Sequence, residues 1–472
     1  MPPRILLPLI VACALFMENL DSTVLSTALP AIAADFGESP IHLKLALTSY
    51  LLALAVFIPA SGWLADRFGA RLVFRLAIVV FVAGSIWCGL SHSIGEIVAA
   101  RVVQGIGGSM MVPVGRLVIL RSVPKSELVG SLAYLTVPAL IGPVMGPPVG
   151  GFITTYFEWR WIFWINVPIG ILGLILATLH IPDIRGEIRT RFDSLGFFLV
   201  SIGLAAFVTG STTLGLNVMP RTIVLGLLAF GAALLVAYYL HSRRRENPIL
   251  DLKLFRLPTF RASAVGASLF RFGVGATPFL LPLMLQLAFG MTPFQSGMIT
   301  FASAIGAITM KFIATPILRG FGFRTVLLVN GLIASVFIAL PGTFQPTTPL
   351  LVMIGLLLVG GLFRSLQFTS INALAFADVP AQRMSQATSM TSVLQQISIS
   401  VGISIAAIGL ELSTGGDIGT ISAGHFVLPF LVVGGLAALS VASFLPLRKD
   451  AGQEMSGHRL APDPVTAARE RF

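Results

Sequence analysis

The stretch Gly62-Trp63-Leu64-Ala65-Asp66-Arg67-Phe68-Gly69-Ala70-Arg71 decides the fold, because it is a charged turn between two apolar segments of about twenty residues each. Gly62 has no side chain and allows two helices to approach each other closely. Asp66 can cap a neighbouring helix or pair with an arginine, and Gly69 permits a tight turn. The stretch therefore predicts two membrane-spanning helices joined by a short polar loop.

The composition of the whole chain also indicates a membrane protein. Of its 472 residues, 55% are hydrophobic and only 11% are charged, against roughly 25% charged residues in soluble domains. A soluble core of this length could not bury so much apolar surface. The hydrophobic residues fall in blocks of about twenty, separated by short charged or Gly/Pro-rich segments, which is typical of a polytopic all-α membrane protein.

The apolar blocks predict fourteen transmembrane helices. The first eight are expected at 8–33, 44–65, 72–91, 95–119, 129–153, 162–180, 194–215 and 221–241. The other six are expected at 262–289, 295–317, 324–342, 348–375, 385–411 and 424–446. Several of these segments exceed the length that a bilayer requires, and tilting would absorb the difference.

The net charge of +11 reflects membrane orientation and does not indicate nucleic-acid binding. The lysines and arginines gather in alternate loops, as the positive-inside rule requires, and this pattern predicts that both termini are cytoplasmic. The first segment carries no small-residue cleavage signature before Glu18, so it is expected to remain as an uncleaved helix.

The sequence gives no sign of an enzyme or of an ATP-driven pump. Cys13 and Cys88 both fall in predicted spans and are expected to be core residues, with no disulfide or metal site. We find no Walker phosphate loop, no His/Cys metal cluster and no nucleophile–base pair in the sequence. We therefore expect no cofactor and no bound metal.

A repeat predicts a design of two bundles. Phe68, Gly69 and Arg71 recur in register in the segment Arg319-Gly320-Phe321-Gly322-Phe323-Arg324, which begins with an arginine where the first copy has Asp66. Both segments would then join the second and third helices of a six-helix bundle. The predicted units are an N-terminal bundle (1–181), a central two-helix insert with its linkers (182–261), a C-terminal bundle (262–446) and a disordered cytoplasmic tail (447–472).

Asp21 is the most informative single residue, because it lies in an apolar stretch that runs from Ile5 to Ile32. A carboxylate inside a span costs roughly 2.5–3.5 kcal/mol on insertion scales, so such residues are usually functional. Glu18 lies three residues earlier on the same helical face. Two such carboxylates resist joint ionisation, which predicts a proton site. Alternatively, the helix ends near Leu20 and both are ordinary flanking charges.

The segment 129–153 contains a second pattern, Gly142-Pro143-Val144-Met145-Gly146-Pro147-Pro148-Val149-Gly150-Gly151. Glycines recur four residues apart at 142, 146 and 150 and form a small-residue stripe that permits close helix contact. Pro143 and Pro147 interrupt the hydrogen-bond ladder and can bend the helix. Ordinary membrane packing is the alternative explanation of this stripe.

Together these motifs resemble the major facilitator superfamily. The stretch Gly62–Arg71 is similar to its loop signature between the second and third helices, and Gly142–Gly151 looks like its antiporter signature. Arg101-Val102-Val103-Gln104-Gly105 resembles the fourth-helix motif, whose arginine is implicated in proton transfer; a snorkelling arginine is the alternative. Leu20–Pro30 and Trp159–Pro168 are similar to the fourteen-span drug:proton antiporters of the EmrB/QacA type, although Ser26 stands where asparagine is usual.

The resemblance implies a fold of two six-helix bundles with two inserted helices, and a proton-driven exporter of small amphipathic compounds that works by alternating access. Asp21, Glu18 and Arg101 would couple proton movement, while Gly62, Asp66, Arg67, Gly69 and Arg71 would form the gating loop. The protein would be a monomer in the bacterial inner membrane, whose partners are substrate, protons and lipid and could include accessory export proteins. A dedicated exporter of a metabolite such as an amino acid, sugar or siderophore is an alternative, and a membrane receptor or enzyme is a remote one.

Polar residues in the second half are candidates for the substrate cavity. They are Arg271, Lys311, Arg364, Gln367 and Asn372. Arg271 is too deep in its segment to snorkel, so it is expected to face water, substrate or a carboxylate, with Glu18 or Asp21 as its partner. Lys311 and Arg364 could instead snorkel toward loops, and the amides could serve helix packing.

Overall fold

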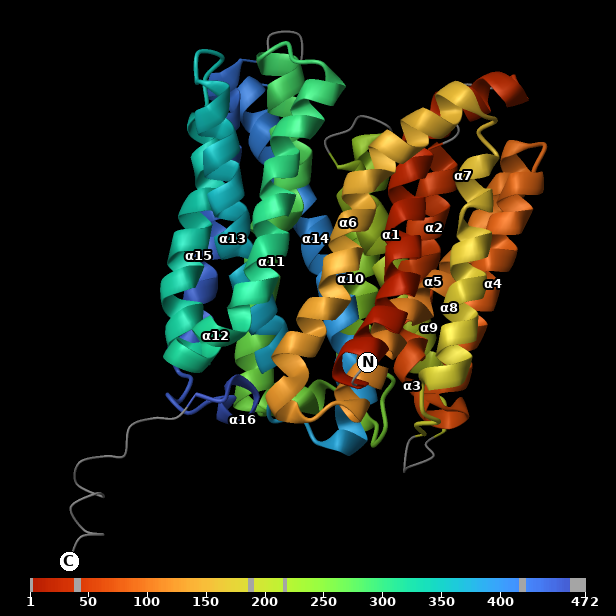
Figure 1. Cartoon of the computed structure of the whole chain (residues 1–472), viewed down its shortest axis with the longest axis vertical. Helices are drawn as coiled ribbons and strands as arrows, with labels where there is room; N and C mark the ends of the chain where they lie inside the picture. Colours follow the sequence, from red (N-terminus) through yellow and green to blue (C-terminus); the bar gives the residue numbers. More distant parts are fainter. Residues whose placement is uncertain (1–2, 38–43, 186–190, 215–218, 416–421, 459–472) are drawn as a thin grey trace, which may run out of the picture.

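The computed structural model describes residues 3–37, 44–185, 191–214, 219–415 and 422–458 (Figure 1). Within these ranges the chain is helical and forms no β-strand, which confirms the predicted all-α class. The helices up to residue 244 are α1 (Pro3–Phe36), α2 (Lys44–Phe57), α3 (Ser61–Phe68), α4 (Ala70–Leu90), α5 (Ile94–Ser122), α6 (Leu128–Tyr156), α7 (Trp161–Trp164), α8 (Asn166–His180), α9 (Ser194–Thr213) and α10 (Arg221–Arg244). Those that follow are α11 (Pro258–Leu283), α12 (Pro293–Ala339), α13 (Leu350–Leu374), α14 (Met384–Thr414), α15 (Val427–Leu439) and α16 (Gln453–Ser456).

Twelve helical stretches among the described residues are long and apolar enough to cross a membrane. One of them, Gln295–Thr343, contains Gly322 in a left-handed conformation (φ 71°) and divides there into two arms, within the predicted repeat. Helix α6 is not among the twelve, but its 29 residues give it a length of about 44 Å, enough for a span. With α6 and both arms of α12, the helices are compatible with the fourteen predicted segments.

Contacts between helices sort most of them into two groups. Helices α1, α2, α4, α5, α6 and α8 pack on one another and form the first bundle, and α11 to α15 form the second bundle. The bundles meet where α6 contacts α12 and α13, and where α3 and α5 contact α14. Figure 1 shows α12 and α15 on the left and α4 and α8 on the right. The boundaries 1–181 and 262–446 of the two bundles remain a proposal.

Helices α9 and α10 pack as a pair beside the two bundles. Helix α9 contacts α2 of the first bundle and α14 of the second, and Ser201 on α9 donates a hydrogen bond to the Val56 carbonyl at 2.6 Å. The inserted pair therefore lies against the line along which the two bundles meet. The range 182–261 for the complete insert also remains a proposal.

Glycine positions allow the closest helix contacts inside each bundle. A Cβ at Gly107 on α5 would lie 2.6 Å from the Phe81 backbone nitrogen on α4. A Cβ at Gly361 on α13 would lie 2.1 Å from the Ser303 carbonyl oxygen on α12. Backbone atoms cannot move aside as a flexible side chain can, so these contacts require glycine.

The chain after α15 departs from the prediction of a disordered tail from residue 447. Residues 447–458 are folded: α16 contacts α6 and α12, and Met455 is 1% exposed within the main hydrophobic core. Gly452 and Gly457 take φ angles of 70° and 67°, which lets the chain turn sharply on both sides of α16. The prediction of disorder is wrong for residues 447–458. Burial of Met455 and the two glycine turns stabilise a folded segment despite its polar composition. Residues 459–472 lie outside the described residues.

Helices α3 and α16 lie at the same end of the molecule, the lower end in Figure 1, which is called the α3 end below. The described N-terminal residues lie toward the same end. This arrangement places both described ends of the chain on the same side of the molecule. That this side is the cytoplasmic one remains a prediction from the distribution of lysine and arginine.

Candidate functional site

Asp21 is held in the interior of the first bundle. Helix α1 continues to Phe36, so the alternative that the helix ends near Leu20 is wrong. Asp21 is 3% exposed and accepts hydrogen bonds from Arg101 Nη1 at 2.5 Å and from Asn166 Nδ2 at 2.7 Å. Gln104 Nε2 donates to the same carboxylate at 2.9 Å. Three donors from α5 and α8 therefore hold this buried carboxylate in place inside the bundle.

Arg101 is fully buried and does not snorkel to the membrane surface. Besides Asp21, its guanidinium donates to Gln104 Oε1 at 2.6 Å and to the Ala46 carbonyl at 3.3 Å. Its Cζ also lies 4.3 Å from the centre of the Tyr50 ring, within the range of a cation–π contact. The arginine therefore ties α1, α2 and α5 together through one buried charge.

The outer members of this network come from α4 and α8. Ser85 Oγ accepts hydrogen bonds from Gln104 Nε2 at 2.7 Å and from Asn166 Nδ2 at 3.0 Å. Ser85, Gln104 and Asn166 are all fully buried. The name Asp21 network is used below for Asp21, Ser85, Arg101, Gln104 and Asn166. Protonation or loss of Asp21 would leave a buried guanidinium without its counter-ion. This change would affect α1, α4, α5 and α8, which all contribute residues to the network.

Glu18 has surroundings that differ from those of Asp21, although it lies one turn away on α1. It is 9% exposed, and its Oε2 has no hydrogen-bond partner among the described residues. It is close enough to Asp21 and to Tyr50 for electrostatic interaction with both. Glu18 lines a cavity, whereas Asp21 does not. The two carboxylates thus divide into one inside the bundle and one that faces the cavity.

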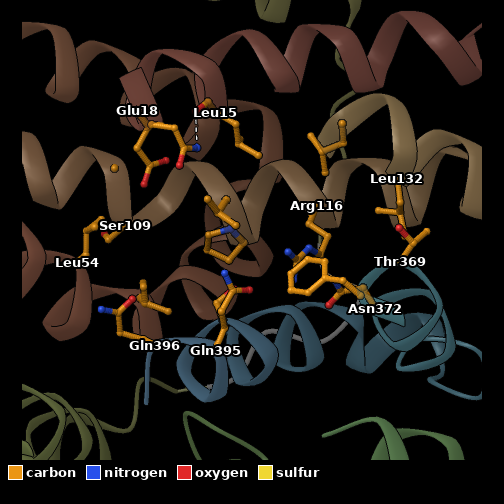
Figure 2. Close-up of a pocket in the computed structure, with 18 of the residues that line it drawn as sticks. Leu15, Glu18, Leu54, Ser109, Arg116, Leu132, Thr369, Asn372, Gln395 and Gln396 are labelled. Carbon is orange, nitrogen blue, oxygen red and sulfur yellow. Dashed lines mark hydrogen bonds between the residues drawn. The ribbon is translucent and has the colours of Figure 1, made fainter. Parts of the chain in front are cut away.

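The cavity has a volume of about 390 Å³ and lies between the two bundles. Its lining comes from α1, α2, α5 and α6 on one side and from α12, α13 and α14 on the other. Figure 2 shows Glu18 toward one end of this space, while Arg116 points toward Asn372. Its volume is within the roughly 300–1,000 Å³ of ligand pockets, and a site between two bundles is where alternating access requires one.

Two of the five predicted cavity candidates line this space, namely Lys311 and Asn372. Lys311 is 5% exposed and donates to Thr369 Oγ1 at 2.6 Å, so it does not snorkel. Arg271 lies behind the lining: its Nη2 donates to Asn372 Oδ1 at 2.9 Å, and its guanidinium lies 5.3 Å from the centre of the Phe368 ring. Arg271 therefore acts on the cavity through two lining residues.

Three expectations for the second half need correction. Arg271 bonds to an amide and forms no ion pair with Glu18 or Asp21 in the described part of the chain, because Arg101 already neutralises Asp21. Arg364 is outside the lining and donates to Ser303 Oγ at 2.6 Å. Gln367 turns toward α12, where it bonds with Asn330 and with the Leu327 carbonyl, and serves helix packing.

The predicted gating loop joins the two bundles at the α3 end. Asp66 Oδ1 accepts a hydrogen bond from Arg121 Nη2 at 2.9 Å, and Asp66 Oδ2 accepts one from the Ser385 hydroxyl on α14. A Cβ at Gly62 would lie 2.7 Å from the Ser385 carbonyl oxygen. The name Asp66 latch is used below for Asp66, Arg121 and Ser385. Because Ser385 belongs to the second bundle, the latch holds the bundles together at this end.

The rest of the loop motif stabilises its own bundle. Gly69 takes a φ of 94° and ends α3, and the Ala70 amide donates to the Ile184 carbonyl at 2.8 Å. Arg71 Nη2 donates to the Thr178 carbonyl on α8. Arg67 is exposed. Gly69 and Arg71 therefore place the loop, whereas Asp66 and Gly62 make its contacts with the other bundle.

The glycine stripe on α6 faces α1, the helix that carries both carboxylates. A Cβ at Gly142 would lie 3.0 Å from Asn19 Cβ, and one at Gly146 would lie 2.1 Å from Thr23 Oγ1. Gly150 is buried, whereas a Cβ at Gly151 would meet no described atom within 4 Å. Pro143 and Pro147 are within α6, but their side chains lie outside the described residues. The stripe thus fixes how closely α6 approaches the segment around Asp21.

Sequence reasoning assigned no role to five residues of the site. They are Tyr50, Ser85, Gln104, Arg116 and Asn166. Arg116 could have been found by the signal that identified Arg271, namely an arginine inside a predicted span. Gln104 and Asn166 were within quoted motifs, but nothing local shows that they reach the same carboxylate. Serine and tyrosine are common in transmembrane helices, so nothing in the sequence distinguished Ser85 and Tyr50 as site residues.

Comparison with known proteins identifies the family to which the chain belongs. The profile described as Major Facilitator Superfamily matches residues 11–403, well over half of the chain. The chain belongs to this superfamily. This transporter is 39% identical over 458 residues to the "Putative multidrug resistance protein MdtD" of Salmonella heidelberg (strain SL476), a match that covers 94% of this chain and 95% of the relative. The protein of the same name from Salmonella newport (strain SL254) is 38% identical over the same length.

Solved structures show the same fold at low sequence identity. The human organic anion transporter MFSD10 is 15% identical with a TM-score of 0.69, and the match covers 94% of this chain and 100% of that one. The proton:xylose symporter XylE is 15% identical with a TM-score of 0.66, over 96% and 98% of the two chains. The predicted superfamily is confirmed, and the chain is a membrane-embedded transporter rather than an enzyme.

Proposed function

We propose that this transporter exports small amphipathic molecules in exchange for protons. The observation that carries the proposal is the buried Asp21–Arg101 pair, which lies one helical turn from Glu18 in the wall of a cavity between the two bundles. Ionisable residues inside membrane spans commonly mark proton relays. The relatives named for multidrug resistance support an export function.

Glu18 is the carboxylate that a proton from the cavity would reach first. Glu18 can take up this proton without breaking an ion pair, since its Oε2 has no partner among the described residues. Protonation of Glu18 removes the charge that repels Asp21, and transfer of the proton to Asp21 would release Arg101. Tyr50, which contacts Arg101 and interacts with Glu18, connects these two steps.

Alternating access would follow from the contacts between the bundles. The Asp66 latch holds them together at the α3 end, which corresponds to a state closed on that side. A change in the Asp21 network would be transmitted along α5, because Arg101 and Arg121 both belong to this helix. Release of the latch would then open the cavity toward the α3 end.

The remaining assignments are further proposals that membership of the superfamily supports. We propose a monomer in the bacterial inner membrane with both termini cytoplasmic, driven by the proton gradient without a cofactor. Accessory export proteins are potential partners. A dedicated exporter of one metabolite is the second candidate, since the lining mixes apolar side chains such as Leu54 and Leu132 with amides such as Gln395 and Gln396.

Asp21→Asn tests proton coupling. The purified chain would be reconstituted in proteoliposomes that contain a pH-sensitive dye and given cationic, neutral and anionic amphipathic compounds. We expect the wild type to move protons when it transports a compound, and Asp21→Asn to lose this movement. Asp35→Asn is the matched control, because Asp35 is also on α1 but forms a half-exposed pair with Arg160.

Loss of the buried carboxylate could also impair folding, so Glu18→Gln provides a second test that leaves the Asp21–Arg101 pair intact. Gel filtration and thermal unfolding would show that each variant is folded. Transport by the wild type without proton movement would contradict antiport. Full coupling in both variants would remove the two carboxylates from the mechanism.

A further inference from the structure

The cavity contains more positive than negative charge. Arg116 and Lys311 both line it, whereas Glu18 is the one carboxylate in the described lining. Arg271 adds a third cation directly behind Asn372 and Phe368. Arg116 and Arg271 are close enough to interact as like charges. The charges therefore sum to a positive field whether or not Glu18 is protonated.

None of these three cations has a carboxylate partner among the described residues. Lys311 donates to a threonine hydroxyl, and Arg271 donates to the Asn372 amide oxygen. Arg116 Nη1 has only a long contact, 3.5 Å, to Thr391 Oγ1. Elsewhere in the same chain Arg101 is paired with Asp21, so the fold can supply a counter-ion where one is needed. Buried cations without counter-ions are costly, and a ligand that brings one relieves the cost.

The neutral groups around these cations also suit an anion. Asn372 lines the cavity, and its Oδ1 accepts from Arg271, so its Nδ2 is the group that can donate to a ligand. In Figure 2, Arg116 points toward Asn372, and both lie away from Glu18. A guanidinium binds a carboxylate through two parallel hydrogen bonds, and an ammonium adds a point charge. Apolar side chains of Leu132 and Phe368 line the same space and suit an organic body.

We propose that Arg116 and Lys311, which line the cavity from opposite bundles, bind a carboxylate group of the transported substrate. The substrate class is accordingly the small amphipathic organic anion, which differs from the cationic drug that a buried carboxylate alone would suggest. Arg271 is a positioning residue, because it orients Asn372 and adds charge without lining the cavity. This inference rests on the proposed transport function, since it names the substrate of the same cavity.

Binding to the purified chain in lipid nanodiscs tests the inference without any transport. The probes are 1-naphthoate, its uncharged methyl ester and 1-naphthylmethylammonium, which share one aromatic body and differ in charge. Isothermal titration calorimetry gives the affinity of each probe. We expect the carboxylate to bind at least about tenfold more tightly than the other two, since a charge-assisted bond is about twice as strong as a neutral one.

Variants locate the binding group. Lys311→Met and Arg116→Met should each weaken naphthoate binding about tenfold or more and change binding of the ester little. Lys311→Arg keeps the charge and should retain binding. Arg364→Met is the matched control, because it removes a cation from the same bundle outside the cavity lining. Glu18→Gln removes the negative charge from the lining and should raise naphthoate affinity.

The possible outcomes separate this inference from the proposed function. If naphthoate binds no more tightly than the ester and the ammonium, or if Lys311→Met and Arg116→Met both bind it normally, the inference is wrong. Proton-coupled transport of cations together with that result would leave the proposed function intact. Naphthoate binding that depends on Lys311 and Arg116, without proton movement during transport, would support the inference and contradict proton coupling.

Discussion

The Asp66 latch predicts a measurable shift in the balance between the two access states. In Asp66→Asn the acceptor of the Ser385 hydrogen bond, which joins the two bundles, becomes neutral, and the negative charge that attracts Arg121 is lost. The side chains of Arg121 and Asp66 are 10% and 20% exposed, so water screens the pair only in part. We expect the variant to populate the state that is open toward the α3 end more than the wild type does.

The magnitude follows from the loss of charge on the acceptor that joins the bundles. A hydrogen bond to a charged group contributes about 1.5–3 kcal/mol to stability, and the partial exposure of this pair places it near the lower limit. A loss of about 1.5 kcal/mol in the closed state changes the ratio of the two states about tenfold. Substrate affinity should change less, because neither Asp66 nor Arg121 lines the cavity.

Accessibility labelling measures this ratio. Cys13 and Cys88 would be replaced, and a single cysteine at Ser109 in the cavity lining would be labelled in vesicles of both orientations. Asp66→Asn should raise labelling from the α3 end about tenfold. Asp183→Asn is the matched control, because Asp183 pairs with Arg185 at the surface of a single segment.

A double-mutant cycle decides whether the pair itself is responsible. Arg121→Gln should produce a similar shift, and the double variant should add little to either single change. Unchanged labelling in Asp66→Asn together with normal transport would refute the latch. Additive shifts in the double variant would show that the two residues act separately.

Two further predictions concern packing. Gly146→Ala should destabilise the protein by about 1–3 kcal/mol, because the added Cβ would lie 2.1 Å from Thr23 Oγ1 and 2.6 Å from Thr23 Cβ. Gly151→Ala on the same helix is the matched control and should change thermal stability little. Met455→Ser should lower thermal stability, because Met455 is 1% exposed. Glu454→Gln is the matched control and should change the free energy of unfolding by less than about 1 kcal/mol, because the pair of Glu454 with Lys125 is exposed. Equal melting temperatures within either matched set would contradict the packing described.

The sequence was sufficient for the class of protein, the approximate spans and the superfamily. Hydropathy is a sum over neighbouring residues, so a span can be identified without knowing what packs against it. Asp21 was identified for the same reason, because the free-energy cost of a carboxylate inside an apolar stretch depends only on the neighbouring sequence. Gly322 was placed at a turn by its match to Gly69, and the structure gives both residues a positive φ.

Only the tertiary structure decided which polar side chains meet. Gln367 and Thr369 are two residues apart on α13, yet Gln367 bonds to Asn330 on α12 while Thr369 lines the cavity, because successive helical residues point about 100° apart. Asp21 pairs with Arg101 because α1 and α5 pack side by side, and this proximity also removed the expected partner of Arg271. The partner of a buried charge depends on how helices distant in the sequence rotate and pack together, and this information is not contained in any one segment.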